Sequence, residues 1–135
     1  MQDKVFFDSN IIIYLYSEDE IEKIKFIKEI LLNNTNIIST QVINELCNIF
    51  KRKFKIDYEK LLEILNEIEN SFEIYKINLN TIKYGINISK KYDYSYYDSL
   101  IIAQALENNC STLYSEDLQH KQIIEKTLKI INPFK

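Results

Sequence analysis

The sequence predicts an α/β fold with a mainly parallel sheet, and two patterns carry this prediction. Short runs rich in β-branched and aromatic residues alternate with longer segments in which apolar residues recur at helical spacing. Such alternation is typical of a parallel sheet that is covered by helices on both faces. The 135 residues contain no repeat, no low-complexity tract and no linker, so we expect one domain spanning residues 1–135.

Each element of this sheet can be assigned to a stretch of sequence. Strands are expected at 5–7 (VFF), 36–39 (NIIS), 72–77 (FEIYKI), 111–114 (STLY) and 128–131 (LKII). Helices are expected near residues 10–16, 18–33, 41–54, 58–70, 80–92, 96–108 and 117–126. Ser17 and Glu20 match a capping box, which explains the acidic run SEDE as a helix start without any function.

Composition excludes several classes of site. Gly85 is the only glycine, whereas loops that cradle phosphates through backbone N–H groups need several. Cys47 and Cys110 form no C-x-x-C pair, and His120 is the single histidine, so the sequence offers no zinc motif and little basis for a histidine triad. The longest apolar run, IIIYLY, is far shorter than the roughly 18 residues of a membrane span. We therefore expect a cytoplasmic protein without a membrane partner.

The net charge of −3 favours neither nucleic acid nor an acidic partner, but the local distribution is more informative. Residues 51–55 (KRKFK) and the pair Lys90 and Lys91 form basic spots. These cations could attract a phosphate backbone, or they could be helix-end residues that stabilise the helix dipole. The sequence leaves both interpretations open.

Asp98 stands where an apolar residue is expected. At helical spacing it shares a stripe with Ile101, Ile102 and Ala105, which is the face that a helix turns toward its core. Burying even a neutral polar group without a partner costs roughly 2–7 kcal/mol, and burying a charge costs more. Some other group must therefore compensate for this carboxylate.

Three further acids map to the same edge of the sheet. Asp8 follows the first strand, Glu45 lies in the first turns after the second, and Asp117 follows the fourth. Helix beginnings and strand carboxyl ends share one edge in such a fold, and ligands bind along it. Taken singly, the acids also fit as helix caps: Asp8 and Asp117 precede expected helices, and Ser95 with Asp98 matches a capping box.

The convergence of four acids points to a cation. Carboxylates about 4 Å apart repel by roughly 4 kcal/mol per pair at an effective dielectric near 20. A fold retains such a cluster only if a cation or shared protons neutralise it. Because oxygen is the only available ligand atom, the expected cation is Mg²⁺ or Mn²⁺ rather than zinc or copper.

Four blocks of the sequence resemble the signature blocks of PIN-domain ribonucleases, and in particular the VapC-type toxins of toxin-antitoxin modules. The blocks are DSNIIIYL with Asp8, NEL with Glu45, YSYYDSLIIAQAL with Asp98 and LYSEDL with Asp117. The resemblance covers nearly the whole chain. It implies a three-layer α/β/α fold, a parallel sheet of order 3-2-1-4-5, and endonuclease activity on RNA that depends on Mg²⁺ or Mn²⁺.

The resemblance also implies roles for individual residues. Asp8, Glu45, Asp98 and Asp117 match the family's catalytic acids. Asp8 and Asp98 are expected to be the principal metal ligands, and Glu45 and Asp117 to hold a second metal or position water. Asn10 and Ser115 match accessory polar residues that orient the substrate or the acids. The implied partners are RNA, a cognate antitoxin and a second copy of the chain in a homodimer.

Two features near these blocks have open interpretations. Glu116 adds a carboxylate beside Asp117, and we expect it to point away from the cleft. The tyrosines that precede Asp98 could stack on RNA bases or could pack between helices or across a dimer interface, and packing is the favoured interpretation. They are Tyr92, Tyr94, Tyr96 and Tyr97.

Other functions compete with the toxin prediction. The chain could be an RNA-processing PIN nuclease outside a toxin-antitoxin module, or a catalytically silent domain that binds metal, RNA or protein. A phosphatase with an aspartyl nucleophile is a further alternative, but such enzymes usually place a second Asp two residues after the first, where this chain has Asn10.

Overall fold

A computed structural model of the chain describes residues 2–135, and these residues form a sheet of six strands in the order β3-β2-β1-β4-β6-β5. β1 is central and pairs in parallel with β2 and β4, whereas β5 runs antiparallel to β6. The α/β class and the mainly parallel sheet are confirmed. The predicted order holds for the five main strands, and the two-residue β5 is an addition at the edge. The strands span Lys4–Phe7 (β1), Thr35–Ser39 (β2), Glu73–Tyr75 (β3), Thr112–Tyr114 (β4), Ile123–Ile124 (β5) and Leu128–Ile131 (β6).

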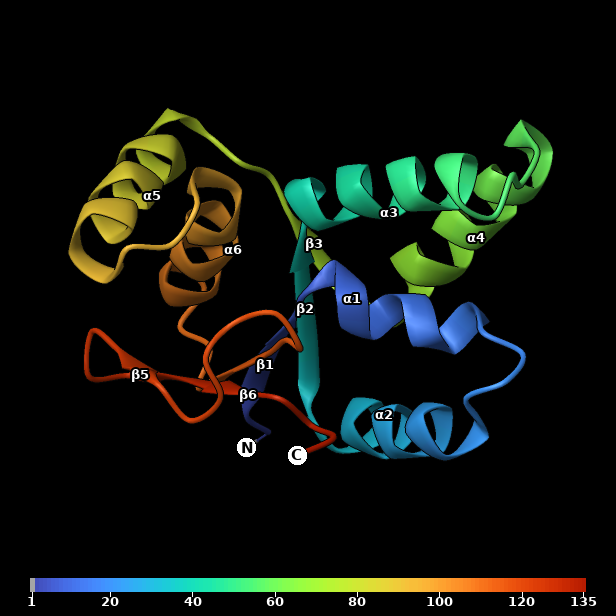
Figure 1. The fold of residues 1–135 in the computed structure, drawn as a ribbon, viewed down its shortest axis with the longest axis horizontal. Helices are drawn as coiled ribbons and strands as arrows, with labels where there is room; N and C mark the ends of the chain where they lie inside the picture. Colours follow the sequence, from blue (N-terminus) through green and yellow to red (C-terminus); the bar gives the residue numbers. More distant parts are fainter. Residues whose placement is uncertain (1) are drawn as a thin grey trace.

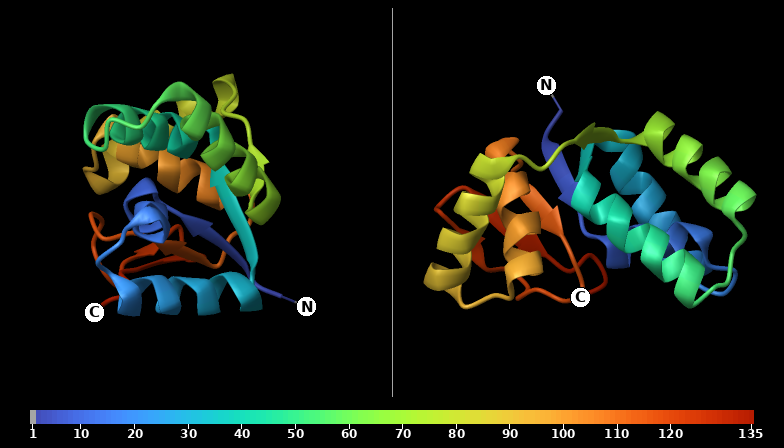
Figure 2. Two further views of the ribbon diagram at one scale, coloured as in Figure 1. Left: turned by 90° about the vertical axis from the view of Figure 1, so that its right-hand side faces the viewer. Right: turned by 90° about the horizontal axis from the view of Figure 1, so that it is seen from above.

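Helices cover both faces of the sheet. Figure 1 shows α1 to α4 on one side of β2 and the pair α5 and α6 on the other, and the view from above in Figure 2 shows the same separation. This is the three-layer arrangement that the sequence predicts. The helices are Ser9–Ile12 (α1), which continues as the 3-10 helix Ile13–Tyr16 (η1), then Ile21–Asn33 (α2), Thr40–Arg52 (α3), Tyr58–Ser71 (α4), Leu79–Tyr92 (α5) and Tyr96–Glu107 (α6).

The helix predicted at 117–126 is wrong. These residues form turns and β5, and Lys121, Glu125 and Lys126 have φ angles of 72°, 48° and 64°, which are incompatible with a right-handed helix. Ile124 is fully buried where β5 pairs with Leu128 of β6. Pairing with a neighbouring strand therefore overrides the local helical pattern.

The capping box predicted for Ser17 and Glu20 is also wrong. α2 begins at Ile21, and its N-cap residue Glu20 makes no side-chain capping hydrogen bond. The Ser17 hydroxyl instead accepts a hydrogen bond from the Asp19 N–H at 3.3 Å, inside the turn that joins η1 to α2. The helix starts three residues later than predicted because this turn uses Ser17 for its own closure.

The hydrophobic core fixes the position of α6. Residues Ser99–Ala105 of this helix are all buried, and at Gly85 of α5 an added Cβ would lie 3.0 Å from Leu100 Cδ2, so the two helices pack closely there. Asp98 lies at the start of α6, where the helix emerges from the core. Within residues 2–135, no helix combines the length and the apolar character that crossing a bilayer requires.

Candidate active site

Asp8 is the centre of the site, and the fold holds it in a defined position. It follows β1 directly and caps α1: its Oδ1 accepts from the Ser9 N–H at 2.8 Å, and its Oδ2 accepts from the Ser115 hydroxyl at 2.8 Å. Only 5% of Asp8 is exposed. Its pKa is raised to about 7, mainly by burial and in smaller part by the charges of Glu45 and Asp98, while the hydrogen bonds from Ser115 and Ser9 oppose the rise.

Glu45 faces Asp8 from the second turn of α3. The Ser9 hydroxyl donates to its Oε1 at 3.0 Å, and the Gln41 side chain donates to its Oε2 at 3.3 Å. Burial is the largest cause that raises the pKa of Glu45, and the charges of Asp98 and Asp117 act in the same direction. Ser9 thus joins the two acids, with its N–H on one and its hydroxyl on the other.

Asp98 approaches from the start of α6 on the opposite helical layer. The Ser95 hydroxyl caps this helix by accepting a hydrogen bond from the Asp98 N–H at 3.2 Å. The cap therefore uses the backbone of Asp98, whereas the Asp98 carboxylate acts on the cleft, since its charge raises the pKa of both Asp8 and Glu45. Figure 1 shows α6 beside β2 and the start of α3 just beyond the end of that strand.

The loop after β4 completes the arrangement. Ser115 is fully buried, and its hydroxyl accepts from the Asp117 N–H at 3.2 Å. Asn10 lies between α1 and this loop: its amide donates to Asp8 Oδ2 and to Ser115 Oγ, each at 3.4 Å, and its oxygen accepts from the Glu116 N–H at 3.2 Å. Asp117 is exposed, and its charge reaches Glu45.

The Glu116 side chain contacts η1, unlike its neighbour Asp117, whose charge acts on Glu45. Its carboxylate accepts a hydrogen bond from the Tyr14 hydroxyl of η1 at 2.7 Å, and Lys23 of α2 donates to that hydroxyl at 3.2 Å. This contact engages the carboxylate with η1 and α2, in keeping with the expectation that it points away from the cleft.

The tyrosines near Asp98 divide into two pairs. Tyr92 donates its hydroxyl proton to Glu125 at 2.8 Å and Tyr94 donates to Gln122, so both hold the turn around β5 against the end of α5. Tyr96 and Tyr97 are 38% and 60% exposed, with ring centres 5.5 Å apart at the start of α6. Packing accounts for the first pair, and the second pair presents aromatic surface beside Asp98.

The donor chemistry of the cluster fits a hard divalent cation. Asp8, Glu45, Asp98 and Asp117 come from four separate segments and supply oxygen ligands only. After burial, the charges of the other acids help to raise the pKa of Asp8 and of Glu45. As the side chains stand, no three Asp, Glu, His or Cys side chains of residues 2–135 converge on a single metal position. Asp8 and Asp98, on opposite walls, remain the expected principal ligands.

Two residues of the site were missed in the sequence. Ser9 bridges Asp8 and Glu45, and Gln41 supports Glu45 from one helical turn earlier on α3. Gln41 could have been identified from its i−4 spacing to Glu45 on the same helix face. Ser9 could not, because its role depends on the contact between α1 and α3, which local pattern does not reveal.

Comparison with known proteins adds a family and a set of similar folds. The family model described as PIN domain matches residues 5–126. The VapBC2 complex of Rickettsia felis, solved with a DNA fragment from its promoter, contains a chain that is 20% identical, with a TM-score of 0.70, covering 96% of this chain and 99% of that one.

Two further solved structures are similar in fold. A toxin-antitoxin complex from Klebsiella pneumoniae is 19% identical with a TM-score of 0.71, covering 96% of this chain and 97% of that one. VapC20 of Mycobacterium tuberculosis, a sarcin-ricin loop cleaving toxin, is 13% identical with a TM-score of 0.66, covering 84% and 89%. Comparison with curated protein sequences finds no significant match.

Proposed function

Because the chain belongs to the PIN domain family, we propose that it is a metal-dependent endoribonuclease and the toxin component of a type II toxin-antitoxin module. One observation carries the proposal: Asp8 is buried, and its pKa is raised to about 7 by that burial together with the charges of Glu45 and Asp98, which come from distant segments. The similarity in fold to chains from toxin-antitoxin complexes supports the toxin assignment.

The chemistry of the site follows from its ligands. Mg²⁺ or Mn²⁺, when bound, lowers the pKa of a water molecule and offsets charge on a phosphodiester. In this proposal Asp8 and Asp98 hold the metal, and Glu45 and Asp117 hold a second ion or orient water. Asn10 and Ser115 act through Asp8, whose carboxylate they keep in one orientation.

The substrate in this proposal is a single-stranded region of RNA. An extended strand exposes its bases, and aromatic side chains hold such bases by stacking, which contributes about 1–3 kcal/mol per base. The exposed rings of Tyr96 and Tyr97 beside Asp98 suit this role.

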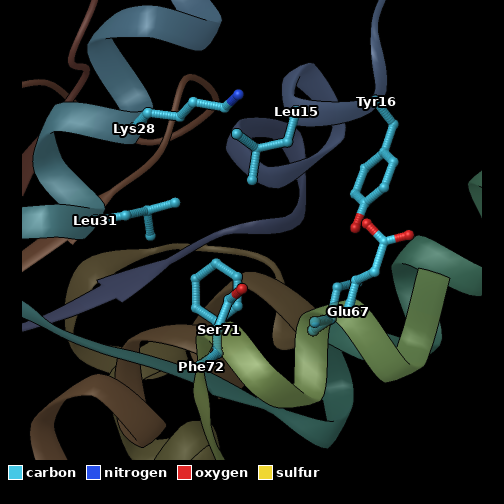
Figure 3. Close-up of a pocket in the computed structure, with 8 residues that line it drawn as sticks. Leu15, Tyr16, Lys28, Leu31, Glu67, Ser71 and Phe72 are labelled. Atoms are coloured by element: carbon cyan, nitrogen blue, oxygen red, sulfur yellow. The ribbon is translucent and has the colours of Figure 1, made fainter.

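In this proposal the antitoxin occupies a partly apolar groove, which lies on the far side of α1 from α6. A cavity of about 250 Å³ opens between η1, α2 and α4, where Lys28, Leu31, Ser71 and Phe72 converge in Figure 3. A second hollow of about 370 Å³ continues from it past Leu32, whose side chain is 80% exposed. An exposed leucine at the rim of an apolar groove favours a protein partner.

Neutralisation requires the antitoxin to reach the acids as well. We expect a segment with an Arg or Lys side chain to enter the cleft and supply the positive charge that the cluster lacks. Leu32→Lys should weaken antitoxin binding and leave RNA cleavage by the free chain unchanged. A complex in which the antitoxin leaves Asp8 and Asp98 open and active would contradict this model.

A homodimer belongs to the same proposal. Leu79 and Ile86 are seven residues apart on α5, so they share one face of the helix, and they are 64% and 48% exposed. Two apolar residues on a solvent-facing stripe favour contact with a second copy. Light scattering should give twice the mass of the chain, and Ile86→Asp should return it to the mass of a monomer.

An RNA cleavage assay tests the enzymatic part of the proposal. The purified chain should cleave end-labelled single-stranded RNA with Mg²⁺ or Mn²⁺ and should stop when EDTA is added. Asp93→Asn is a matched control, because Asp93 is an exposed aspartate at the end of α5. Undiminished cleavage after exhaustive chelation would refute metal dependence.

A further inference from the structure

We propose that the turn between α3 and α4 docks the phosphate backbone of the RNA strand and directs it along α3 into the cleft. The turn, here called the α3–α4 corner, consists of Arg52, Lys53, Phe54, Lys55 and Tyr58, with Lys51 as its internal support. The inference rests on the proposed ribonuclease function and adds a substrate-binding surface outside the acids.

The α3–α4 corner is the densest group of cations in the chain. Residues 51–55 contain four of its 17 Lys and Arg residues, although the net charge is −3. Arg52, Lys53 and Lys55 are exposed. The ion pairs formed within residues 2–135 involve Lys23, Lys60 and Lys91. The side chains of the α3–α4 corner are in none of these pairs and stay available for an external anion.

Internal contacts give the corner a defined shape. Lys51 Nζ donates to the Ile56 carbonyl at 2.7 Å and lies 3.8 Å from the centre of the Tyr58 ring. The Ile56 N–H closes the turn on the Phe50 carbonyl at 3.1 Å, and Lys55 has a φ of 51°, in the left-handed region. These contacts fix the backbone that carries the cations, unlike the backbone of a frayed helix end.

Aromatic surface accompanies the charge. Phe54 is 55% exposed and Tyr58 is 72% exposed. Exposed rings between cations are the combination that binds single-stranded nucleic acid, because bases stack on the rings while phosphates meet the charges. Acidic protein segments also have anionic groups, but they lack bases to occupy the two rings, so RNA is the favoured partner.

Helix α3 connects the corner to the acids. Glu45, Asn48 and Arg52 follow one another at spacings of three and four residues, so they form one stripe on the helix. Seven residues of helix separate Glu45 from Arg52, a distance of about 10 Å. Figure 1 shows α3 running from the edge of the sheet to this corner.

The acidic cleft makes a separate docking site necessary. Without bound metal its carboxylates repel a phosphate backbone, so exposed cations elsewhere on the surface supply the attraction that brings RNA to the acids. Glu18 and Asp19 line a hollow beside Phe54 on the η1 side of the corner. These two acids disfavour a strand on that side and leave the α3 side as its path.

The salt dependence of RNA binding tests the inference without cleavage. The triple variant Arg52→Gln, Lys53→Gln and Lys55→Gln should bind fluorescein-labelled single-stranded RNA about 10- to 100-fold more weakly in EDTA at low salt. Because each lost phosphate contact removes about 0.7 from the slope of log K against log salt, the slope should fall by about 2. The control is Lys25→Gln, Lys83→Gln and Lys129→Gln, which removes the same charge from other exposed positions.

Cleavage kinetics in Mn²⁺ complete the test, with melting curves to show that both triple variants fold. The corner variant should raise KM and leave kcat unchanged, whereas the control should leave both unchanged. Equal salt slopes for the two triple variants would overturn the docking inference even if the chain cleaves RNA. Corner-dependent RNA binding without any cleavage would refute the ribonuclease proposal and support docking. Loss of affinity for the antitoxin alone, with RNA binding intact, would overturn the inference and assign the corner to a protein partner.

Discussion

The site has two walls, one formed by β1 and α1 and the other by α6, and they hold their acids in different ways. On the β1–α1 wall, Asp8 is buried and receives hydrogen bonds from Ser9 and Ser115. On the α6 wall, Asp98 lies at a half-exposed helix start and gives only its backbone N–H to a cap. The first wall fixes the position of a carboxylate at a cost in stability when that group ionises. The second wall keeps a carboxylate accessible at little such cost.

Substitution of either acid should have the largest effect on activity and should leave stability the same or higher. Asp8→Asn and Asp98→Asn should each reduce RNA cleavage by on the order of 10²–10³-fold, the range for losing one group that stabilises charge in a reaction. In EDTA each variant should melt at the same or a higher temperature, because it removes one charge from a self-repelling cluster.

The gain in stability should differ between the variants on the two walls. Asp8→Asn should gain more than Asp98→Asn, since Asp8 is the buried member of the pair. Asp93→Asn, at an exposed position at the end of α5, serves as the unaffected control. An Asp98→Asn variant that is destabilised yet active would show that Asp98 serves only the helix start.

The pH dependence of stability measures how much the ionisation of buried Asp8 destabilises the folded protein. The ordinary pKa of this carboxyl is 3.8, and burial raises it to about 7 in the folded protein. Between these values the folded state binds a proton that the unfolded state has lost, so the free energy of unfolding falls as pH rises. The full span corresponds to about 4 kcal/mol of stability, present below pH 4 and lost by about pH 7.

Urea unfolding in EDTA at pH values from 4.5 to 8 measures this effect. The quantity to follow is the difference in free energy of unfolding between the wild-type chain and Asp8→Asn, because other groups cancel in it. The variant should become the more stable of the two as pH rises. A difference that does not change with pH would mean that Asp8 ionises in the folded state as it does in the unfolded chain.

The sequence predicted this edge of the sheet better than it predicted the surrounding turns. The positions of Asp8, Glu45 and Asp98 follow from strand and helix patterns that are local, and the parallel order of strands then brings them together. The helix predicted at 117–126 is absent because apolar residues of this segment pair with β6 instead. The capping box predicted at Ser17 is absent because the Ser17 hydroxyl accepts a hydrogen bond within the turn before α2.

The remaining features of the site depend on contacts between elements distant in sequence. The Ser9 bridge needs α1 beside α3, and the separation of Tyr92 and Tyr94 from Tyr96 and Tyr97 needs the position of β5. Burial of Asp8 likewise comes from the packed fold rather than from its neighbours in sequence.

The smallest expected effect concerns the helix cap on the second wall. Ser95→Ala removes the hydroxyl that accepts from the Asp98 N–H and should lower stability by about 1 kcal/mol, the usual value for an N-cap. Cleavage should stay within about twofold of wild type, because the cap does not contact the Asp98 carboxylate. Asn78→Ala is the matched control, since Asn78 caps α5 by accepting from the Thr81 N–H at 3.0 Å.

Comparing these two cap variants decides whether the activity of Asp98 depends on the hydrogen bond between its N–H and the Ser95 hydroxyl. If both lose similar stability and both keep activity, the cap on α6 is structural and Asp98 acts through its carboxylate alone. If Ser95→Ala loses tenfold or more in cleavage while Asn78→Ala does not, the cap also positions the acid. The two walls would then share one design, in which a serine holds an aspartate in place, and the contrast between a fixed and an accessible carboxylate would be wrong.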